Sequence, residues 1–94
     1  MRVKKGLIEK VLERLYLDYF PDTCFVEMLC DVMGMKREDK YLKTLSAICV
    51  YLKDQGLTTE ESSGRWRITA SGIDFLVGKS LIKSATPKRR QGGI

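Results

Sequence analysis

The stretch from Tyr41 to Leu57 constrains the fold more than any other part of the chain. Its large apolar residues recur at spacings of three and four, which is the period of one side of an α-helix. That side comprises Leu42, Leu45, Ile48, Cys49 and Leu52. The opposite side carries Lys36, Lys40, Lys43, Ala47 and Asp54. Gly56 follows the last periodic position, where a left-handed turn commonly ends a helix. The pattern predicts a helix that ends near Gln55 and buries one side.

The residues after this helix predict a short β-hairpin. Thr58 and Thr59 begin the first strand, Ser62-Ser63-Gly64 forms the turn, and Arg65-Trp66-Arg67-Ile68 alternates polar and apolar residues on the way back. Neighbouring side chains in a strand point to opposite faces, so both arginines lie on the face opposite Trp66. We expect the indole to pack under the sheet.

An N-terminal helix is predicted from about residue 5 to residue 19. Its buried stripe comprises Ile8, Val11, Leu12, Leu15 and Tyr19. Leu17 and Phe20 point away from this stripe, which leaves them for a later element or for a second subunit. Pro21 ends the helix, because the residue before a proline disfavours helical geometry.

A second helix is predicted over about residues 23 to 33. Asp22 or Thr23 caps its start, and Gly34 closes it. Its inward residues are Phe25, Val26, Leu29, Val32 and Met33. The turn into the third helix is short, so the two helices must cross at a steep angle in the helix-turn-helix manner.

The last predicted helix follows the hairpin and is capped by Thr69 or Ser71. Its inward residues are Ile73, Leu76 and Val77. The apolar pattern allows it to continue through Leu81 and Ile82. We therefore predict one folded domain over residues 1–83 and a basic tail over residues 84–94 that is disordered when free.

Length and composition indicate a small soluble domain. The chain has 94 residues, of which 44% are hydrophobic and 31% charged. Its longest apolar run, Ala47 to Leu52, is far shorter than the roughly 18 residues of a membrane-spanning helix. The basic N-terminus lacks the apolar stretch of an export signal. We expect a cytoplasmic protein.

The net charge of +5 suggests a polyanionic partner, but the positive charge is concentrated at the two ends of the chain. Residues 6 to 78 contain nine basic and twelve acidic side chains. A hypothesis of nucleic-acid binding must therefore rest on where the few central cations lie.

The residue inventory disfavours catalysis and metal binding. The chain has no histidine, the commonest catalytic base, and its carboxylates are scattered over helix faces that we expect to be exposed. Its three cysteines are an odd number without a C-x2-C pair, so neither a disulfide framework nor a structural zinc site is indicated. We expect no enzyme activity, no metal and no cofactor.

The predicted order of three helices, a hairpin and a fourth helix resembles the winged helix-turn-helix family over about residues 5 to 77. Two segments carry the resemblance: YLKDQGLTTEE, a helix end followed by a first strand, and RWRITASGIDFL, a second wing strand followed by a Thr-x-x-Gly helix start. The chain is also similar to small proteins encoded in prophages of the Mu type.

The resemblance implies that the third helix enters the DNA major groove while the hairpin contacts the backbone or minor groove beside it. It implies a small transcriptional regulator whose partner is double-stranded DNA. The implied contact residues are Lys36, Arg37, Lys40, Lys43, Thr44, Tyr51, Arg65 and Arg67.

Two alternatives remain open at this stage. The cations are interspersed with acidic residues and so also fit an ordinary solvated surface; these acids are Glu38, Asp39, Asp54, Glu60 and Glu61. The domain also fits a winged helix that binds a protein partner, with Val50 and Tyr51 in its contact patch.

The resemblance also implies a homodimer, because two-fold symmetry doubles the half-sites contacted. Its contact involves either the first helix, through Leu17 and Phe20, or the last helix, through Leu81 and Ile82. The basic cluster of the tail is a nonspecific DNA arm, a partner-binding peptide or an inert segment.

Overall fold

The computed structural model of the chain describes residues 5–79. Within this range lie four α-helices, a π-helical turn (η1) and one two-stranded antiparallel sheet, so the protein is mainly helical with a small hairpin, as predicted. The elements in chain order are α1 (Lys5–Arg14), η1 (Leu15–Tyr19), α2 (Val26–Val32), α3 (Asp39–Asp54), β1 (Thr58–Ser62), β2 (Arg65–Ile68) and α4 (Ala70–Gly78).

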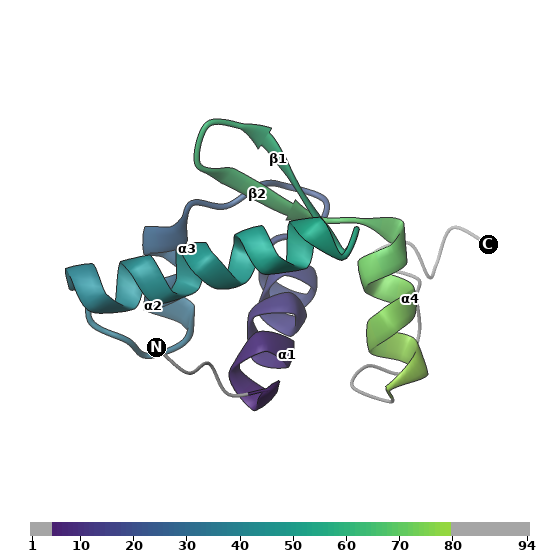
Figure 1. Cartoon of the computed structure of the whole chain (residues 1–94), viewed down its shortest axis with the longest axis horizontal. Helices are drawn as coiled ribbons and strands as arrows, with labels where there is room; N and C mark the ends of the chain where they lie inside the picture. Colours follow the sequence, from purple (N-terminus) through teal and green to yellow (C-terminus); the bar gives the residue numbers. More distant parts are fainter. Residues whose placement is uncertain (1–4, 80–94) are drawn as a thin grey trace.

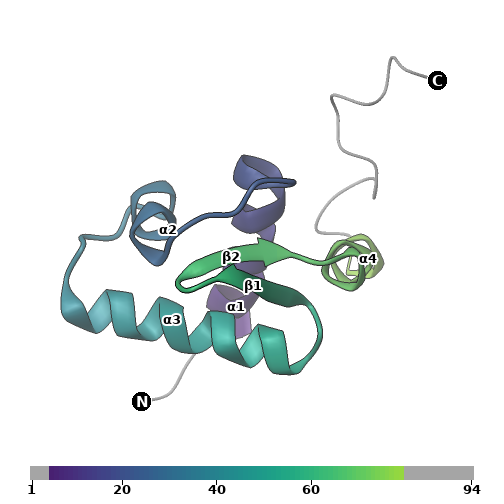
Figure 2. The same ribbon diagram turned by 90° about the horizontal axis from the view of Figure 1, so that it is seen from above.

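The helices are arranged around α1. Figure 1 shows α1 crossing behind the long helix α3, with the hairpin above α3 and with α2 and α4 at opposite ends of the molecule. Seen from above in Figure 2, α3 runs along one edge and leaves one of its long sides uncovered. None of the helices within residues 5–79 is both long enough and apolar enough to span a bilayer.

The core is a single apolar cluster that draws on all four helices and on β2. From α3 it receives Leu45, Ile48, Cys49 and Leu52, as the helical period predicted. Trp66 of β2 is only 5% exposed, which confirms that the indole packs under the sheet. The hairpin is therefore part of the folded core, and its arginine-bearing face is turned outward.

Two glycines end the helices α2 and α3. Gly34 has a φ of 71°, and beyond it the amide of Met35 donates to the carbonyl of Cys30 at 2.9 Å. Gly56 has a φ of 80°, and the amide of Leu57 donates to the carbonyl of Leu52 at 2.9 Å. Both are the left-handed helix ends that glycine favours. The predicted ends of the second and third helices are thus confirmed.

The prediction that the second helix begins at Asp22 or Thr23 is wrong. The chain is extended before α2, and Cys24 pairs with Trp66 of β2 through two backbone hydrogen bonds of 2.9 Å. The first helical residue is therefore Val26, with Phe25 in the cap position. This later start leaves Phe25 40% exposed, although it was predicted to face inward, and Val32, also predicted inward, is 38% exposed.

The end of the first helix also differs from the prediction. The α-helical pattern stops at Arg14 and continues as η1, in which the amide of Phe20 donates to the carbonyl of Leu15 at 2.9 Å. The extra residue in the π-helical turn rotates the side chains, so Tyr16 is buried and Tyr19 only half-buried. Phe20 packs on Tyr16 with 5.7 Å between ring centroids, whereas Leu17 remains 50% exposed.

The start of α4 is set by a threonine cap. The hydroxyl oxygen of Thr69 accepts from the amide of Gly72 at 3.0 Å and donates to the carbonyl of Gly56 at 2.7 Å. Of the two predicted caps, Thr69 is the one observed. Ile73 and Leu76 are buried as predicted. The expected continuation through Leu81 and Ile82 and the expected tail lie outside the described residues.

Candidate nucleic-acid interface

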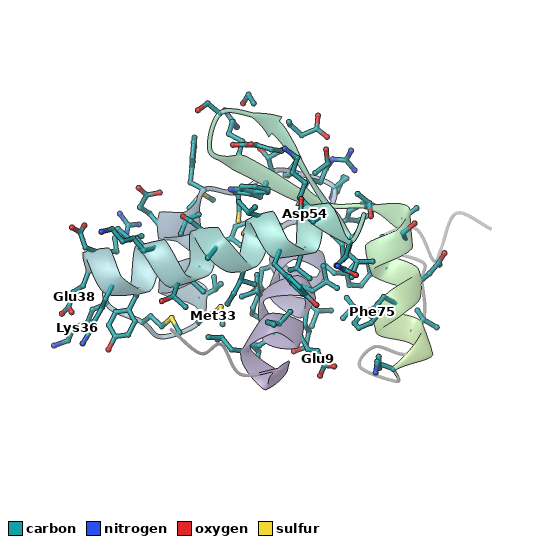
Figure 3. The ribbon with its side chains drawn as sticks, in the orientation of Figure 1. Glu9, Met33, Lys36, Glu38, Asp54 and Phe75 are labelled. Carbon is teal, nitrogen blue, oxygen red and sulfur yellow. The ribbon has the colours of Figure 1, made fainter. Side chains whose placement is uncertain are left out.

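Lys36, Lys40 and Lys43 lie on the open side of the molecule along the N-terminal half of α3 and the turn before it. All three are exposed; Lys40 and Lys43, three positions apart, share one side of α3, whereas Lys36 lies in the non-helical segment before the helix. None of them forms an ion pair with another residue whose side chain is described, from position 6 to position 79. Figure 3 shows Lys36 and Glu38 together at the start of α3. We call these three residues the lysine row.

Arg37 lies beside the lysine row, but its guanidinium is already bound. Its Nε donates to Oδ1 of Asp31 at 3.1 Å, and its Nη2 donates to Oδ2. This hydrogen bonding lowers the pKa of the Asp31 carboxyl and raises the pKa of Arg37. The pair ties the end of α2 to the segment that enters α3. Arg37 therefore acts within the fold and has less charge to offer to a partner.

The two arginines of the hairpin also have local partners. Arg67 pairs with Glu61, with Nη2 and Oε2 2.6 Å apart. The Nε of Arg65 donates to the hydroxyl of Thr23 at 3.1 Å, and its guanidinium carbon lies 5.1 Å from the ring centroid of Phe25. The arginine-bearing face is thus exposed, yet its positive charge is partly balanced by the acidic side chains of β1.

Of Thr44 and Tyr51, only Thr44 lies beside the lysine row, one helical turn after Lys40 on α3. The hydroxyl of Thr44 donates to the carbonyl of Lys40 at 2.7 Å, within α3 itself. Tyr51 is 50% exposed but follows Lys43 by eight positions, which is about 12 Å along a helix axis. The structure groups the three lysines and separates Tyr51 from them.

The open side of α3 is divided into two chemically different halves. Its N-terminal half carries the lysine row with Glu38 and Asp39 between the lysines. Its C-terminal half exposes Val50 and Tyr51, which are 47% and 50% accessible, and then Asp54. Figure 3 places Asp54 at the far end of α3 from Lys36. The three lysines of the lysine row therefore concentrate positive charge at the first half, whereas the second half carries Lys53 beside Asp54.

A groove lies between α1, the C-terminal end of α3 and α4, and sequence reasoning missed it. Its volume is about 370 Å³, and apolar side chains, among them Ile8, Leu12 and Phe75, form much of its surface. Glu9 and Lys79 also line it, and the Nζ of Lys79 lies 5.6 Å from the ring centroid of Phe75. Its walls come from segments more than 60 residues apart in the sequence, so no local pattern indicates it.

The three cysteines are all buried. Burial raises the pKa of the Cys24 and Cys49 thiols to about 12 and raises the pKa of Cys30 as well. Neutral, inaccessible thiols behave as small apolar side chains. In the part of the chain that the structure describes, no three Cys, Asp or Glu residues are grouped closely enough to hold a metal ion.

Comparison with known proteins does not assign the chain to a family. No family model, curated protein or solved structure gave a match. The case for a function therefore depends on the two surfaces described above, the lysine row and the groove.

Proposed function

We propose that the protein binds double-stranded DNA as a winged helix and acts as a small transcriptional regulator. In this proposal the N-terminal half of α3 enters the major groove and the β1–β2 hairpin lies beside it. The observation that carries the proposal is the lysine row, three exposed lysines that form no ion pair with a described side chain, two of them on the uncovered side of α3 and one just before it. The order of helices and hairpin is compatible with a winged-helix layout.

The position of the lysine row suits this role. Recognition helices contact base edges chiefly with residues near their N-terminus, where Lys40 and Lys43 lie. Lysine reaches phosphate oxygens and the acceptor atoms of guanine in the major groove. Because Arg37 and Arg67 are held in ion pairs, we assign most of the phosphate neutralisation to the three lysines.

A salt-dependent DNA titration tests the proposal. If the three lysines each neutralise one phosphate, they contribute about −2.7 to the slope of the logarithm of the affinity for duplex DNA against the logarithm of salt concentration. The change Lys43→Ala should weaken binding at low salt and make this slope shallower by about 0.9. Fluorescence anisotropy with a labelled duplex measures both quantities.

Lys10→Ala is the matched control, because it removes the same charge from α1. There the Nζ of Lys10 lies 3.8 Å from Oε1 of Glu13. This variant should keep the wild-type slope. If Lys43→Ala and Lys10→Ala bind DNA equally well at every salt concentration, the lysine row is not the DNA contact and the proposal fails.

One observation favours a second candidate function, a winged helix that binds a protein. Val50 and Tyr51 are large, exposed and adjacent on α3, and Tyr51 also lines the groove. A double change of Val50 and Tyr51 to serine should leave DNA affinity unchanged if DNA is the partner of the lysine row. If this variant loses its regulatory activity while its DNA affinity is unaltered, the protein-binding alternative is favoured.

A further inference from the structure

The groove between α1, α3 and α4 leaves apolar surface uncovered next to the point where the described chain ends. Ile8, Leu57 and Phe75 line it on three sides, and Lys79, the last described residue, lines it as well. Figure 3 shows Phe75 and Glu9 in the space between α4 and α1. The next residues of the chain therefore start at the edge of the groove.

We propose that this groove is the docking site for residues 80–83 of the same chain, with the side chains of Leu81 and Ile82 against its apolar surface. The proposal goes beyond DNA binding and does not depend on it. It gives the groove an intramolecular occupant and fixes where the basic tail leaves the folded domain.

Chain length and composition both favour this occupant. One residue spans at most about 3.6 Å, so Leu81 and Ile82 lie within about 7 to 11 Å of Lys79, close enough to reach Phe75. Among residues 80–94 the large apolar side chains are Leu81, Ile82 and Ile94, and the first two directly follow the groove edge. Burying them removes apolar surface from water on both sides of the contact.

Charge complementarity supports the same occupant. Glu9 lines the groove, and its carboxylate forms no ion pair with any side chain described between residues 6 and 79. Lys83 follows Ile82 directly, so a docked segment carries an ammonium group that is complementary in charge to Glu9.

Paramagnetic relaxation enhancement tests the proposal without DNA. A nitroxide label is attached to Ser84→Cys in the full chain, where Cys24, Cys30 and Cys49 are buried and resist labelling. We expect the label to broaden the amide signals of Ile8 and Phe75 strongly and those of α2, at the other end of the molecule, weakly. The double change Leu81→Ser and Ile82→Ser should restore the signals of Ile8 and Phe75.

Ile94→Ser is the matched control, because it removes a large apolar side chain from the same segment, twelve positions after Ile82 in the sequence. It should leave the broadening unchanged. An unaltered amide spectrum of α2 in the double variant verifies that the domain still folds.

Three results would overturn the proposal. The first is equal broadening of α2 and of the groove residues. The second is broadening of Ile8 and Phe75 that persists in the double variant. The third comes from a mixed sample, in which labelled chains carry no ¹⁵N and the observed chains carry no label: broadening there would show that a second copy occupies the groove.

Discussion

The cationic side chains near α3 differ in whether they already form an ion pair within the protein. The lysine row extends into solvent, whereas Asp31 and Glu61 hold Arg37 and Arg67. A guanidinium whose positive charge is already balanced by a carboxylate is attracted less strongly to a phosphate than an ammonium group without an ion pair is. A count of positive residues therefore overstates what this surface offers to DNA.

Asp31→Asn should release Arg37 and strengthen DNA binding at low salt. The change removes one negative charge beside the lysine row and frees a guanidinium for one more phosphate. The salt slope should become steeper by about 0.9. Asp74→Asn, an equal charge change at an exposed site on α4, is the control in the same anisotropy titration. Equal gains in DNA affinity from both variants would mean that the affinity depends on net charge alone.

The Asp31–Arg37 pair also predicts a pH dependence of stability. Arg37 holds the pKa of Asp31 below its ordinary value in the folded protein, so the unfolded chain binds this proton at higher pH. The stabilisation is fully present above the unfolded pKa of about 3.9 and is lost as pH falls through the lower folded pKa. Urea unfolding of wild type and Asp31→Asn should therefore differ at about pH 6, and the difference should shrink as the pH falls below about 3.9. A difference that stays constant over this range would contradict the prediction.

At the scale of elements, a contact between residues distant in sequence determines where α2 begins and which of its side chains are exposed. The backbone pairing of Cys24 with Trp66 keeps the chain extended up to Phe25 and delays the start of α2. Asp22 and Thr23 are good capping residues, but they lie before a strand contact that only the folded hairpin supplies. Helix ends marked by glycine were predicted correctly, because the requirement for a left-handed residue is local.

The close approach of α4 to Leu57, in the turn before β1, and to Ile68 of β2 makes Gly72 a sensitive position. A Cβ there would lie 2.3 Å from the carbonyl oxygen of Leu57 and 2.6 Å from a side-chain carbon of Ile68. Gly72→Ala should destabilise the fold by about 1 to 3 kcal/mol, the usual cost of overpacking. Chemical denaturation measures this difference in unfolding free energy.

Gly78→Ala is the control for that change within the same helix. No atom lies within 4 Å of a Cβ at Gly78, so alanine there should be neutral or stabilise by up to about 1 kcal/mol. Equal stabilities of the Gly72 and Gly78 variants would show that α4 does not pack against Leu57 as closely as described.

At the scale of the whole molecule, charge is distributed unevenly along the chain. The net charge of +5 comes from the two ends, while residues 6 to 78 carry more acids than bases. The lysine row is thus a local exception on a domain that is slightly acidic elsewhere. With this arrangement, the lysine row would set the orientation in which the domain docks on DNA. The basic ends of the chain would add a salt-dependent electrostatic attraction.

Truncation after Ser84 separates these two contributions. The shortened chain lacks Lys88, Arg89 and Arg90 and should bind DNA more weakly and with a shallower salt slope. Lys43→Ala should still weaken the binding that remains, because the lysine row is part of the folded domain. Complete loss of DNA binding on truncation would instead identify the tail as a nonspecific arm and the domain as a non-binder.

For the candidate site, the sequence correctly predicted which cations face outward but not which are engaged. The helical period placed the lysine row on the open side of α3, and strand alternation placed Arg65 and Arg67 opposite Trp66. The partners of Arg65, Thr23 and Phe25, depend on how the hairpin lies over the segment before α2, whereas Arg67 pairs with Glu61 inside the hairpin. No spacing in the chain encodes that contact.

The sequence by itself determined the element types, the buried side of α3, the glycine-ended turns and the threonine cap of α4, because each follows from backbone preference or from a period within one segment. Only the tertiary structure decided the late start of α2, the contacts of Arg65 with Thr23 and Phe25, and the groove beside Phe75. Those features depend on distances between segments far apart in the chain, and such distances exist only once the core has formed.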